Sequence, residues 1–289
     1  MTRADSPVGQ LRRLRAVLRQ ERDSKGYTQR DVAEALDWSP SKLIRIEKGT
    51  VGISVTDLKA LLLHYDITER ERVDQLVDMV KAGKKPAWWH QYRDVYQQQF
   101  INFIGLESSA VRIKQFQGLI VPGSVQTPEY AAAVMRAYGS SDEAAIERGV
   151  EVRMRRREEL IRSGGPELSF IIDESALLRQ VGDTEVMVGQ VRQLMELSAY
   201  KQMHIQVMPF SAGPNAAMVG SFIVLELSDE QDDYAMLLET PDGNMLVEEP
   251  NDQTARYWKF FNDLQQMALS EDDTQVFLDE LLGRLGEDE

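Results

Sequence analysis

The segment from residue 28 to residue 49 constrains the fold of this chain more than any other. Residues 28–31 read Thr-Gln-Arg-Asp, and a threonine followed three positions later by an acidic residue satisfies free amides at the start of a helix. Ser39-Pro40 marks a second helix start, because serine caps helices well and proline is tolerated at the first helical position. Gly49 is expected to end that helix. The segment therefore predicts two short helices joined by a tight turn at Asp37.

The rest of the first 85 residues also has the pattern of short helices at close spacing. Apolar residues recur at helical intervals from Leu11 to Leu18, and Gly26 is expected to end that helix. Ser54 and Thr68 are expected to open a fourth and a fifth helix. Residues 82–86 contain a glycine and a proline, which favour a linker. We therefore expect one domain of five helices over residues 1–85 and a second domain over residues 86–289.

Charge is distributed unevenly between these two domains. Residues 1–85 contain 17 Lys and Arg against 13 Asp and Glu, a net charge of +4. Residues 86–289 contain 16 basic and 34 acidic residues, a net charge of −18, which together give the −14 of the whole chain. An acidic chain repels nucleic acid overall, so the basic first domain is the part that we expect to approach it.

The second of the two helices should expose short polar and basic side chains near its start. The major groove of DNA admits one such helix, and residues in its first turns reach the base edges. Arg45 is the candidate for a bidentate contact to guanine, and Gln29, at the positive end of its helix, is the candidate for a phosphate. The predicted DNA-contacting residues are Thr28, Gln29, Arg30, Ser39, Pro40, Ser41, Lys42, Arg45 and Lys48.

The motifs of this segment resemble a known DNA-binding family. Gly26-x-Thr28-Gln29, Val32-Ala33, Leu36, Ser39-x-Ser41 and Ile44-x-Ile46-Glu47-x-Gly49 are similar to the Cro/C1-type (XRE) helix-turn-helix. The resemblance implies a lambda-repressor-like five-helix bundle with its recognition helix at Ser39–Gly49. It also implies that Glu47 is structural and ties the recognition helix to a neighbour. The family usually has glycine in the turn where this chain has Asp37, a residue that tolerates positive φ.

The second domain carries its own ordered series of motifs. They are Val121-Pro122-Gly123, Gln126-Thr127-Pro128-Glu129-Tyr130, Arg153-x-x-Arg156, Asp173-Glu174-x-x-Leu177 and Val207-Met208-Pro209-Phe210-x-x-Gly213. The series is similar to the C-terminal domain of WhiJ-like actinobacterial regulators, which is described as antitoxin-like. That resemblance implies a small partner protein encoded nearby, and roles in development or secondary metabolism. The chain departs from the family at Ser124-Val125, where leucines are usual, and at Arg157, where glutamine is usual.

The second domain mixes helical and strand-like patterns. Residues 142–163 read as a strongly charged helix, and the chain from residue 251 onward is helical again. Between them lie β-rich runs and turn signals. The runs are at residues 168–172, 204–208, 221–227 and 235–239, and the turns are at residues 213–215 and 241–244. The predicted fold class is mainly α with a smaller α+β part, an N-terminal five-helix bundle followed by an α+β regulatory domain.

Three features of the second domain have both a functional and a structural explanation. The aromatic run that starts at Trp89 is spaced like one face of a long helix, and it is either a packing stripe or the wall of a ligand pocket. The loop over residues 122–130 is either a structural turn or a holder of an anion or partner segment. Arginines at residues 153–157 form either a salt-bridged helix face or a phosphate or partner site. The candidate ligand- or partner-binding residues are Trp89, Tyr92, Tyr96, Gln126, Thr127, Arg153 and Arg156.

No familiar catalytic pattern occurs in the sequence. The three histidines are scattered, and there is no HExxH motif, no phosphate-binding glycine loop and no GxSxG elbow. The chain has no cysteine, which excludes disulfides, thiolate metal sites and cysteine nucleophiles. We therefore expect no enzyme activity, no catalytic residue, no metal and no cofactor.

Neither a signal peptide nor a membrane span is expected. The arginine-rich N-terminus lacks an apolar core, and no stretch approaches the roughly 18 apolar residues of a spanning helix. We expect a cytoplasmic, nucleoid-associated protein with no membrane partner.

Together these features predict a DNA-binding transcriptional regulator. We expect it to bind double-stranded DNA at an operator as a homodimer, because one helix buries too little DNA for strong specificity. A partner protein or a small-molecule effector at the C-terminal domain would control its occupancy. The alternative is an antitoxin-like interaction protein that neutralises a small partner protein, with DNA binding that is only autoregulatory.

Overall fold

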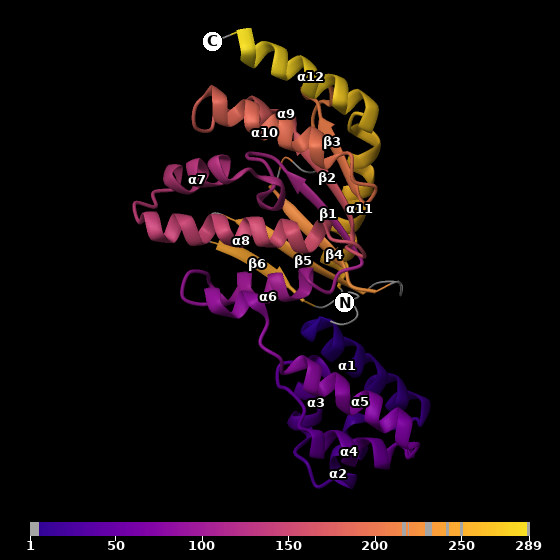
Figure 1. The fold of residues 1–289 in the computed structure, drawn as a ribbon. Helices are drawn as coiled ribbons and strands as arrows, with labels where there is room; N and C mark the ends of the chain where they lie inside the picture. Colours follow the sequence, from indigo (N-terminus) through magenta and orange to yellow (C-terminus); the bar gives the residue numbers. More distant parts are fainter. Residues whose placement is uncertain are drawn as a thin grey trace. The chain divides into compact units, whose positions relative to one another are not determined.

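The computed structural model describes residues 6–215, 218, 220–228, 233–240, 243–248 and 251–287 (Figure 1). The chain divides into two units, Met1–Trp88 and Trp89–Glu289, and each is described by itself. The sequence had placed the boundary after Lys85. The predicted fold class is confirmed, because a helical bundle at the N-terminus is followed by a unit that combines helices with a mixed sheet.

Among its described residues the N-terminal unit consists of five helices. They are α1 (Pro7–Ser24), α2 (Gln29–Ala35), α3 (Pro40–Lys48), α4 (Val55–His64) and α5 (Arg70–Gly83). Their starts follow the local chemistry of the sequence. Thr28 caps α2 in a capping box with Asp31, and the Ser54 hydroxyl accepts the backbone N–H of Asp57 at the start of α4.

Two helix starts differ in detail from the prediction. Ser39 holds the N-cap position of α3, but its hydroxyl lies 3.2 Å from the Ser41 hydroxyl and caps no backbone amide. Helix α5 begins at Arg70 after Glu69, one residue later than a Thr68 cap would start it.

The turn between α2 and α3 has the backbone conformation that the sequence predicts. Asp37 adopts φ 54°, in the left-handed region that glycine usually occupies. Gly49 ends α3 at φ 78°. The helices then pack around one apolar core, which includes Leu14, Leu18, Val32, Leu43, Ile46, Leu58, Leu61, Leu62 and Leu76.

The C-terminal unit is built on a six-stranded mixed sheet. Its strands are β1 (Arg112–Gln117), β2 (Glu167–Asp173), β3 (Met203–Met208), β4 (Phe222–Glu226), β5 (Tyr234–Thr240) and β6 (Gly243–Val247), in the spatial order β3-β2-β1-β4-β5-β6. Strands β1, β2 and β3 are parallel, whereas β4, β5 and β6 continue the sheet in antiparallel pairs. Strand β1 is therefore central.

Helices cover both faces of this sheet (Figure 1). The α-helices are α6 (Gln98–Glu107), α7 (Pro128–Ala137), α8 (Glu143–Ile161), α9 (Glu174–Leu178), α10 (Thr184–Leu197), α11 (Asp252–Met267) and α12 (Glu271–Glu287), with 3-10 turns η3 (Gly123–Val125) and η4 (Phe210–Ala212). Helix α11 packs Phe261 and Leu264 onto one face, against Phe116 and Phe222. Helices α6 and α8 lie over the opposite face.

The predicted aromatic helix is wrong. Residues 88–92 form a separate 3-10 turn, η2 (Trp88–Tyr92), and α6 begins only at Gln98. The backbone N–H groups of residues 95 and 96 donate to the Tyr92 carbonyl oxygen, and Gln97 has an extended backbone at ψ 150°. Arg148 of α8 donates to the Asp94 carboxylate and to the Gln91 carbonyl oxygen. These tertiary contacts stabilise the non-helical segment between η2 and α6, which the helical spacing of the aromatic residues did not indicate.

The central strand of the sheet was not predicted, and one predicted turn lies partly outside the described residues. Strand β1 carried no strand prediction, although it pairs with both β2 and β4. The turn expected at residues 241–244 is only partly visible, because residues 241 and 242 lie outside the described residues, and Gly243-Asn244 already belongs to β6.

Candidate nucleic-acid interface

Helix α3 has one buried and one exposed face. Leu43, Ile46 and Glu47 are buried in the N-terminal unit. Ser41, Arg45 and Lys48 are exposed, and their spacing of four and three residues places them on one side of the helix. Ser39 and Pro40, at its start, are exposed as well. The predicted contact residues of α3, Lys42 excepted, thus form a continuous outward face.

Two cations of this face have no ion pair within the described part of the chain. The Arg45 guanidinium donates from Nε to the Ser41 carbonyl oxygen at 3.3 Å, a contact within its own helix. Lys48 has no salt bridge there either. A charge without a counterion inside the protein keeps its full attraction for an external anion such as DNA phosphate.

Lys42 and Arg30 differ from these two, because each is bound inside the unit. Lys42 is half-buried, its Nζ lies 2.7 Å from Asp57 Oδ1 of α4, and it sits 3.9 Å from the centre of the Trp38 ring. Lys42 is therefore only partly exposed and already paired, and its predicted contact with the DNA backbone stays a prediction. Burial alone would raise the pKa of Asp57, but hydrogen bonds from Lys42 and Ser54 outweigh it and lower that pKa. Arg30 is exposed and pairs with Glu34 at 3.0 Å along α2.

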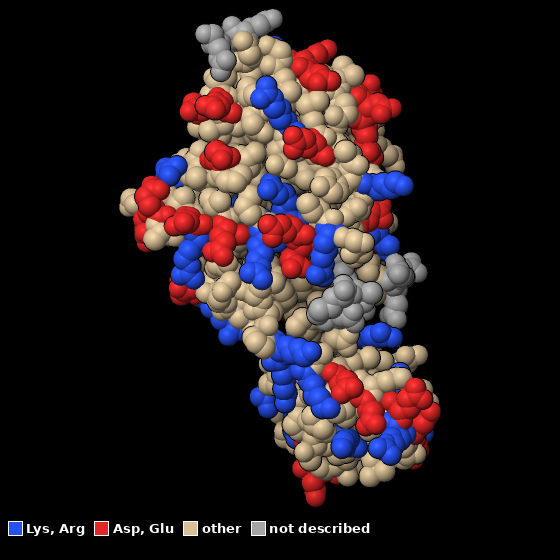
Figure 2. Space-filling view, in the orientation of Figure 1, with Lys and Arg blue, Asp and Glu red and all other residues tan. Residues whose placement is uncertain are grey.

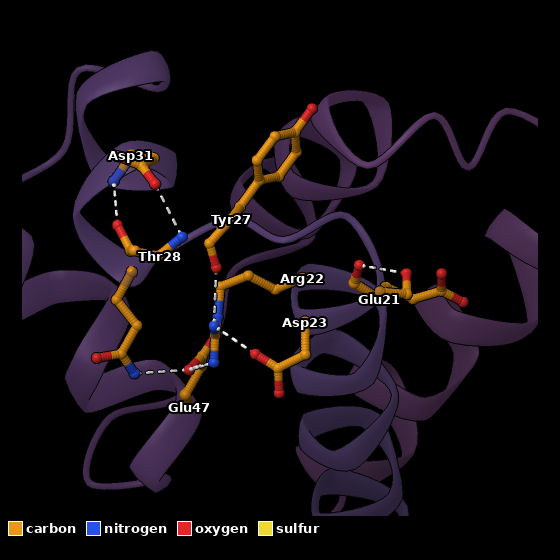
Figure 3. A network of polar contacts seen from close by, with 9 residues as sticks. Glu21, Arg22, Asp23, Tyr27, Thr28, Asp31 and Glu47 are labelled. Atoms are coloured by element: carbon orange, nitrogen blue, oxygen red, sulfur yellow. Dashed lines mark hydrogen bonds and ion pairs between the residues drawn. The ribbon is translucent and has the colours of Figure 1, made fainter.

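A buried carboxylate fixes the two helices of the motif to α1 (Figure 3). Glu47 is 3% exposed and accepts hydrogen bonds from Arg22 Nε at 2.8 Å and from Arg22 Nη2 at 3.1 Å. Gln29 Nε2 donates to the same carboxylate at 2.7 Å. Glu47 therefore joins α1, α2 and α3, which agrees with the structural role that the family resemblance implies.

The same contact positions the start of α2. The hydrogen bond from Gln29 Nε2 to Glu47 holds the Gln29 side chain at the N-terminus of α2. Gln29 is half-buried there, and Thr28 beside it is exposed. The Thr28 hydroxyl accepts the N–H of Asp31, and the Asp31 carboxylate accepts the N–H of Thr28. Hydrogen bonds from Thr28 lower the pKa of Asp31, so this cap is charged at neutral pH. The phosphate role predicted for Thr28 and Gln29 stays a prediction.

The C-terminal unit brings together four of the seven candidate ligand residues. Tyr96, Gln126, Arg153 and Arg156 line one cavity of about 1000 Å³ between α6, α8 and the sheet. The other three lie outside its wall. Trp89 and Tyr92 are buried in the packing, and Thr127 caps α7 with its own N–H bound to Gln190.

Several charged side chains of α8 and of the residue that ends it form ion pairs. On the face of the C-terminal unit drawn in Figure 2, basic and acidic side chains are interspersed. Arg148 pairs with Asp94 at 2.6 Å, and Arg162 pairs with Glu159 at 2.8 Å.

Of the arginines at residues 153–157, Arg156 pairs with Glu107 of α6 at 2.6 Å and Arg157 donates to the Gln126 carbonyl oxygen at 3.0 Å. Arg153 has no ion pair among the described residues, so the salt-bridged explanation does not extend to it.

Sequence reasoning missed two buried polar residues of this cavity, Gln115 and Gln117 of β1. The segment from Arg112 to Gln117 carries little strand signal, because its two apolar residues, Ile113 and Phe116, are three positions apart and do not alternate. Lysine is also depleted in strands, so neither the pattern nor the composition of this segment indicates one.

Comparison with known families gives one match within each unit. Residues 11–76 match a model described as a helix-turn-helix domain, and residues 100–280 match a model described as a domain of unknown function (DUF5753). No curated protein and no solved structure matches the chain. Within the described residues, every helix is too short or too polar to span a membrane.

Proposed function

The chain belongs to the family described as a domain of unknown function (DUF5753) and carries a helix-turn-helix domain, which supports a DNA-binding regulator. From this premise we propose that it is a sequence-specific transcriptional regulator that reads its operator with α3. The observation that carries the proposal is the exposed face of α3, on which Arg45 and Lys48 have no ion pair within the described residues.

Each residue of this face has a role that its position permits. Arg45 lies one turn into the helix, where a guanidinium can reach O6 and N7 of a guanine together. Lys48, a turn further along, suits a phosphate of the backbone. Small residues at the start of the helix, Ser39, Pro40 and Ser41, allow close approach to the groove floor.

The Glu47 network gives this face a fixed geometry. Base readout requires that the recognition helix keep one orientation relative to the helices that contact the phosphates. Arg22 and Gln29 hold α3 through a buried carboxylate, so the orientation is set before DNA is bound.

We further propose that two copies bind one operator with half-sites about one helical turn apart, because a single recognition helix buries too little DNA for strong discrimination. In this account the C-terminal unit controls occupancy through a partner protein or ligand. The protein acts in the cytoplasm at the nucleoid and catalyses no reaction.

Fluorescence anisotropy of the full chain tests the proposal. DNA from upstream of its own gene is titrated beside a scrambled duplex of equal length, at about 50 and 200 mM salt. The expected result is a Kd of about 10 nM on the first duplex and a large ratio over the second. Equal binding to both, or to neither, contradicts the operator proposal. Co-purification of a small partner protein together with that result would support the antitoxin-like alternative.

A further inference from the structure

The cavity of the C-terminal unit is lined by two arginines, the carboxylates of Asp173 and Glu239, aromatic rings and amides rather than by a uniformly apolar surface. Its walls come from α6 and α8, and its floor from β1, β4 and β5. We propose that it binds a small molecule in which a planar ring is joined to an anionic group. This inference goes beyond the proposed function and does not depend on DNA binding.

The anionic group would lie beside two arginines of α8. Arg153 donates from Nη1 to the Gly149 carbonyl at 3.0 Å, but its Nε is buried without a hydrogen-bond partner. Arg156 is 6% exposed, and its Nε and Nη2 donate to Glu107 at 2.8 and 2.6 Å, which leaves Nη1 for another acceptor. The charge of Arg156 is compensated by Glu107, whereas the charge of Arg153 is not matched by any described carboxylate.

Arg153 Nε and Arg156 Nη1 both lie next to the space beside Gly123. A Cβ atom on this glycine would lie 3.7 Å from Arg153 Nε and 3.9 Å from Arg156 Nη1. An anion in this space lies next to both guanidinium groups, and an oxygen slightly nearer to them can accept the charge-assisted hydrogen bonds that are the strong ones. A buried cationic donor without an acceptor is costly, and a bound anion removes that cost.

The planar ring would lie against the aromatic wall. Tyr96 and Phe100 have ring centroids 4.7 Å apart, and Phe100 and Phe103 have centroids 6.0 Å apart. All three line the cavity, and Tyr96 and Phe100 are only half-buried. Exposed ring area of this kind favours an offset stack with another planar group.

The floor of the cavity supplies hydrogen bonds for polar edges of the ring. Gln115 and Gln117 are buried on the central strand, and they form a chain in which Gln115 Nε2 donates to Gln117 Oε1 at 3.0 Å and Gln117 Nε2 donates to Glu239 Oε2 at 2.9 Å. Gln126 is 1% exposed, and its Oε1 has no hydrogen-bond partner. Buried amides are normally satisfied, so an unpaired amide oxygen at a cavity wall points to a ligand that donates to it.

The size of the cavity favours a small molecule over a protein segment. Ligand pockets span about 300–1000 Å³ and combine apolar walls with a few placed polar groups. The volume of about 1000 Å³ lies at the upper end of that range. Either a phosphate or a carboxylate could supply the anion, since both accept from guanidinium groups.

Isothermal titration calorimetry of the full chain tests the proposal with two sets of probes. The phosphate set is AMP and GMP, and the carboxylate set is indole-3-acetate and 4-hydroxybenzoate. Adenosine has the ring without the anion, and inorganic phosphate has the anion without the ring. We expect at least one set to bind. If AMP binds, adenosine and inorganic phosphate should each bind about tenfold more weakly or worse.

Two variants locate the binding. Gly123→Ala places a methyl group between the free donors at ordinary contact distance, at a residue whose φ is not left-handed, so the fold should be kept. Arg153→Met removes the unmatched charge. Both should lower affinity about tenfold or more. Gly189→Ala in α10, where an added Cβ meets open space, is the matched control and should bind like the unaltered chain.

The proposal is overturned if no complete probe of either set binds with a Kd below about 1 mM. It is also overturned if probes bind Gly123→Ala and Arg153→Met as tightly as the control. DNA binding is measured separately by anisotropy, so a failure of the operator proposal and a failure of this site give different results.

Discussion

Removal of the Glu47 carboxylate should destabilise the N-terminal unit by about 3 kcal/mol. In Glu47→Ala, two nitrogens of Arg22 and the amide nitrogen of Gln29 lose their acceptor. Deleting one partner of a buried ion pair costs about 3–5 kcal/mol, because the other charge stays buried. The Arg22 side chain is 12% exposed and keeps hydrogen bonds to Asp23 and to the Tyr27 carbonyl, which sets the loss at the lower end of that range.

Hydrogen exchange of the full chain measures this loss in the N-terminal unit alone. Protection of the slowest amides in α1, α2 and α3 reports the free energy of opening of that unit, apart from the C-terminal unit. A domain of this size changes its melting temperature by about 4–8 °C per kcal/mol, so the first thermal transition should fall by more than about 10 °C. Glu34→Ala, which breaks the exposed pair with Arg30, is the control and should cost no more than about 0.5 kcal/mol. Equal losses in the two variants would refute the role of Glu47.

Three further perturbations test other parts of the structure. Hydrogen bonds from Arg112 and Trp258 outweigh burial and lower the pKa of Glu226. The stabilising contribution of the Glu226 carboxylate is therefore present above about pH 4.3 and is lost as the pH falls through the lowered pKa. The free energy of unfolding of Glu226→Gln in urea should depend less on pH in that range. Gly165→Ala places a Cβ 2.1 Å from the Leu160 carbonyl oxygen and should lower the free energy of unfolding by about 2 kcal/mol, measured by thermal unfolding. A loss near zero would contradict the close approach of the backbone at Gly165. Asp37→Ala should lower the free energy of unfolding by about 1 kcal/mol because residue 37 has a left-handed φ, whereas Asp37→Gly should not. Equal stability of the two variants would exclude the left-handed conformation at residue 37.

The N-terminal elements were predictable because their signals are local. Thr28 and Ser54 cap helices through backbone groups three residues away. Asp37 tolerates the left-handed φ of its turn without help from distant residues. The pairing of Lys42 was not predictable, since its partner Asp57 lies in another helix and only the packed bundle brings the two together.

The C-terminal sheet depended more on distant pairing. Strand β1 has only two apolar residues, Ile113 and Phe116, and it is held by β2 and β4, which come much later in the chain. The cavity has the same origin. Arg153 and Arg156 could be chosen from a motif, but Gln115 and Gln117 became candidates only when β1 was placed beneath α8.

The central claim is that α3 reads DNA through Arg45, and paired anisotropy titrations of two variants test it most directly. Arg45→Ala should lower the ratio of operator to scrambled-duplex affinity by about 10- to 100-fold, the loss expected for one bidentate base contact. Lys48→Ala should instead weaken binding to both duplexes alike and reduce the salt slope by about 1. If Arg45→Ala keeps the full ratio of the unaltered chain, α3 does not read the operator through this residue and the account is contradicted.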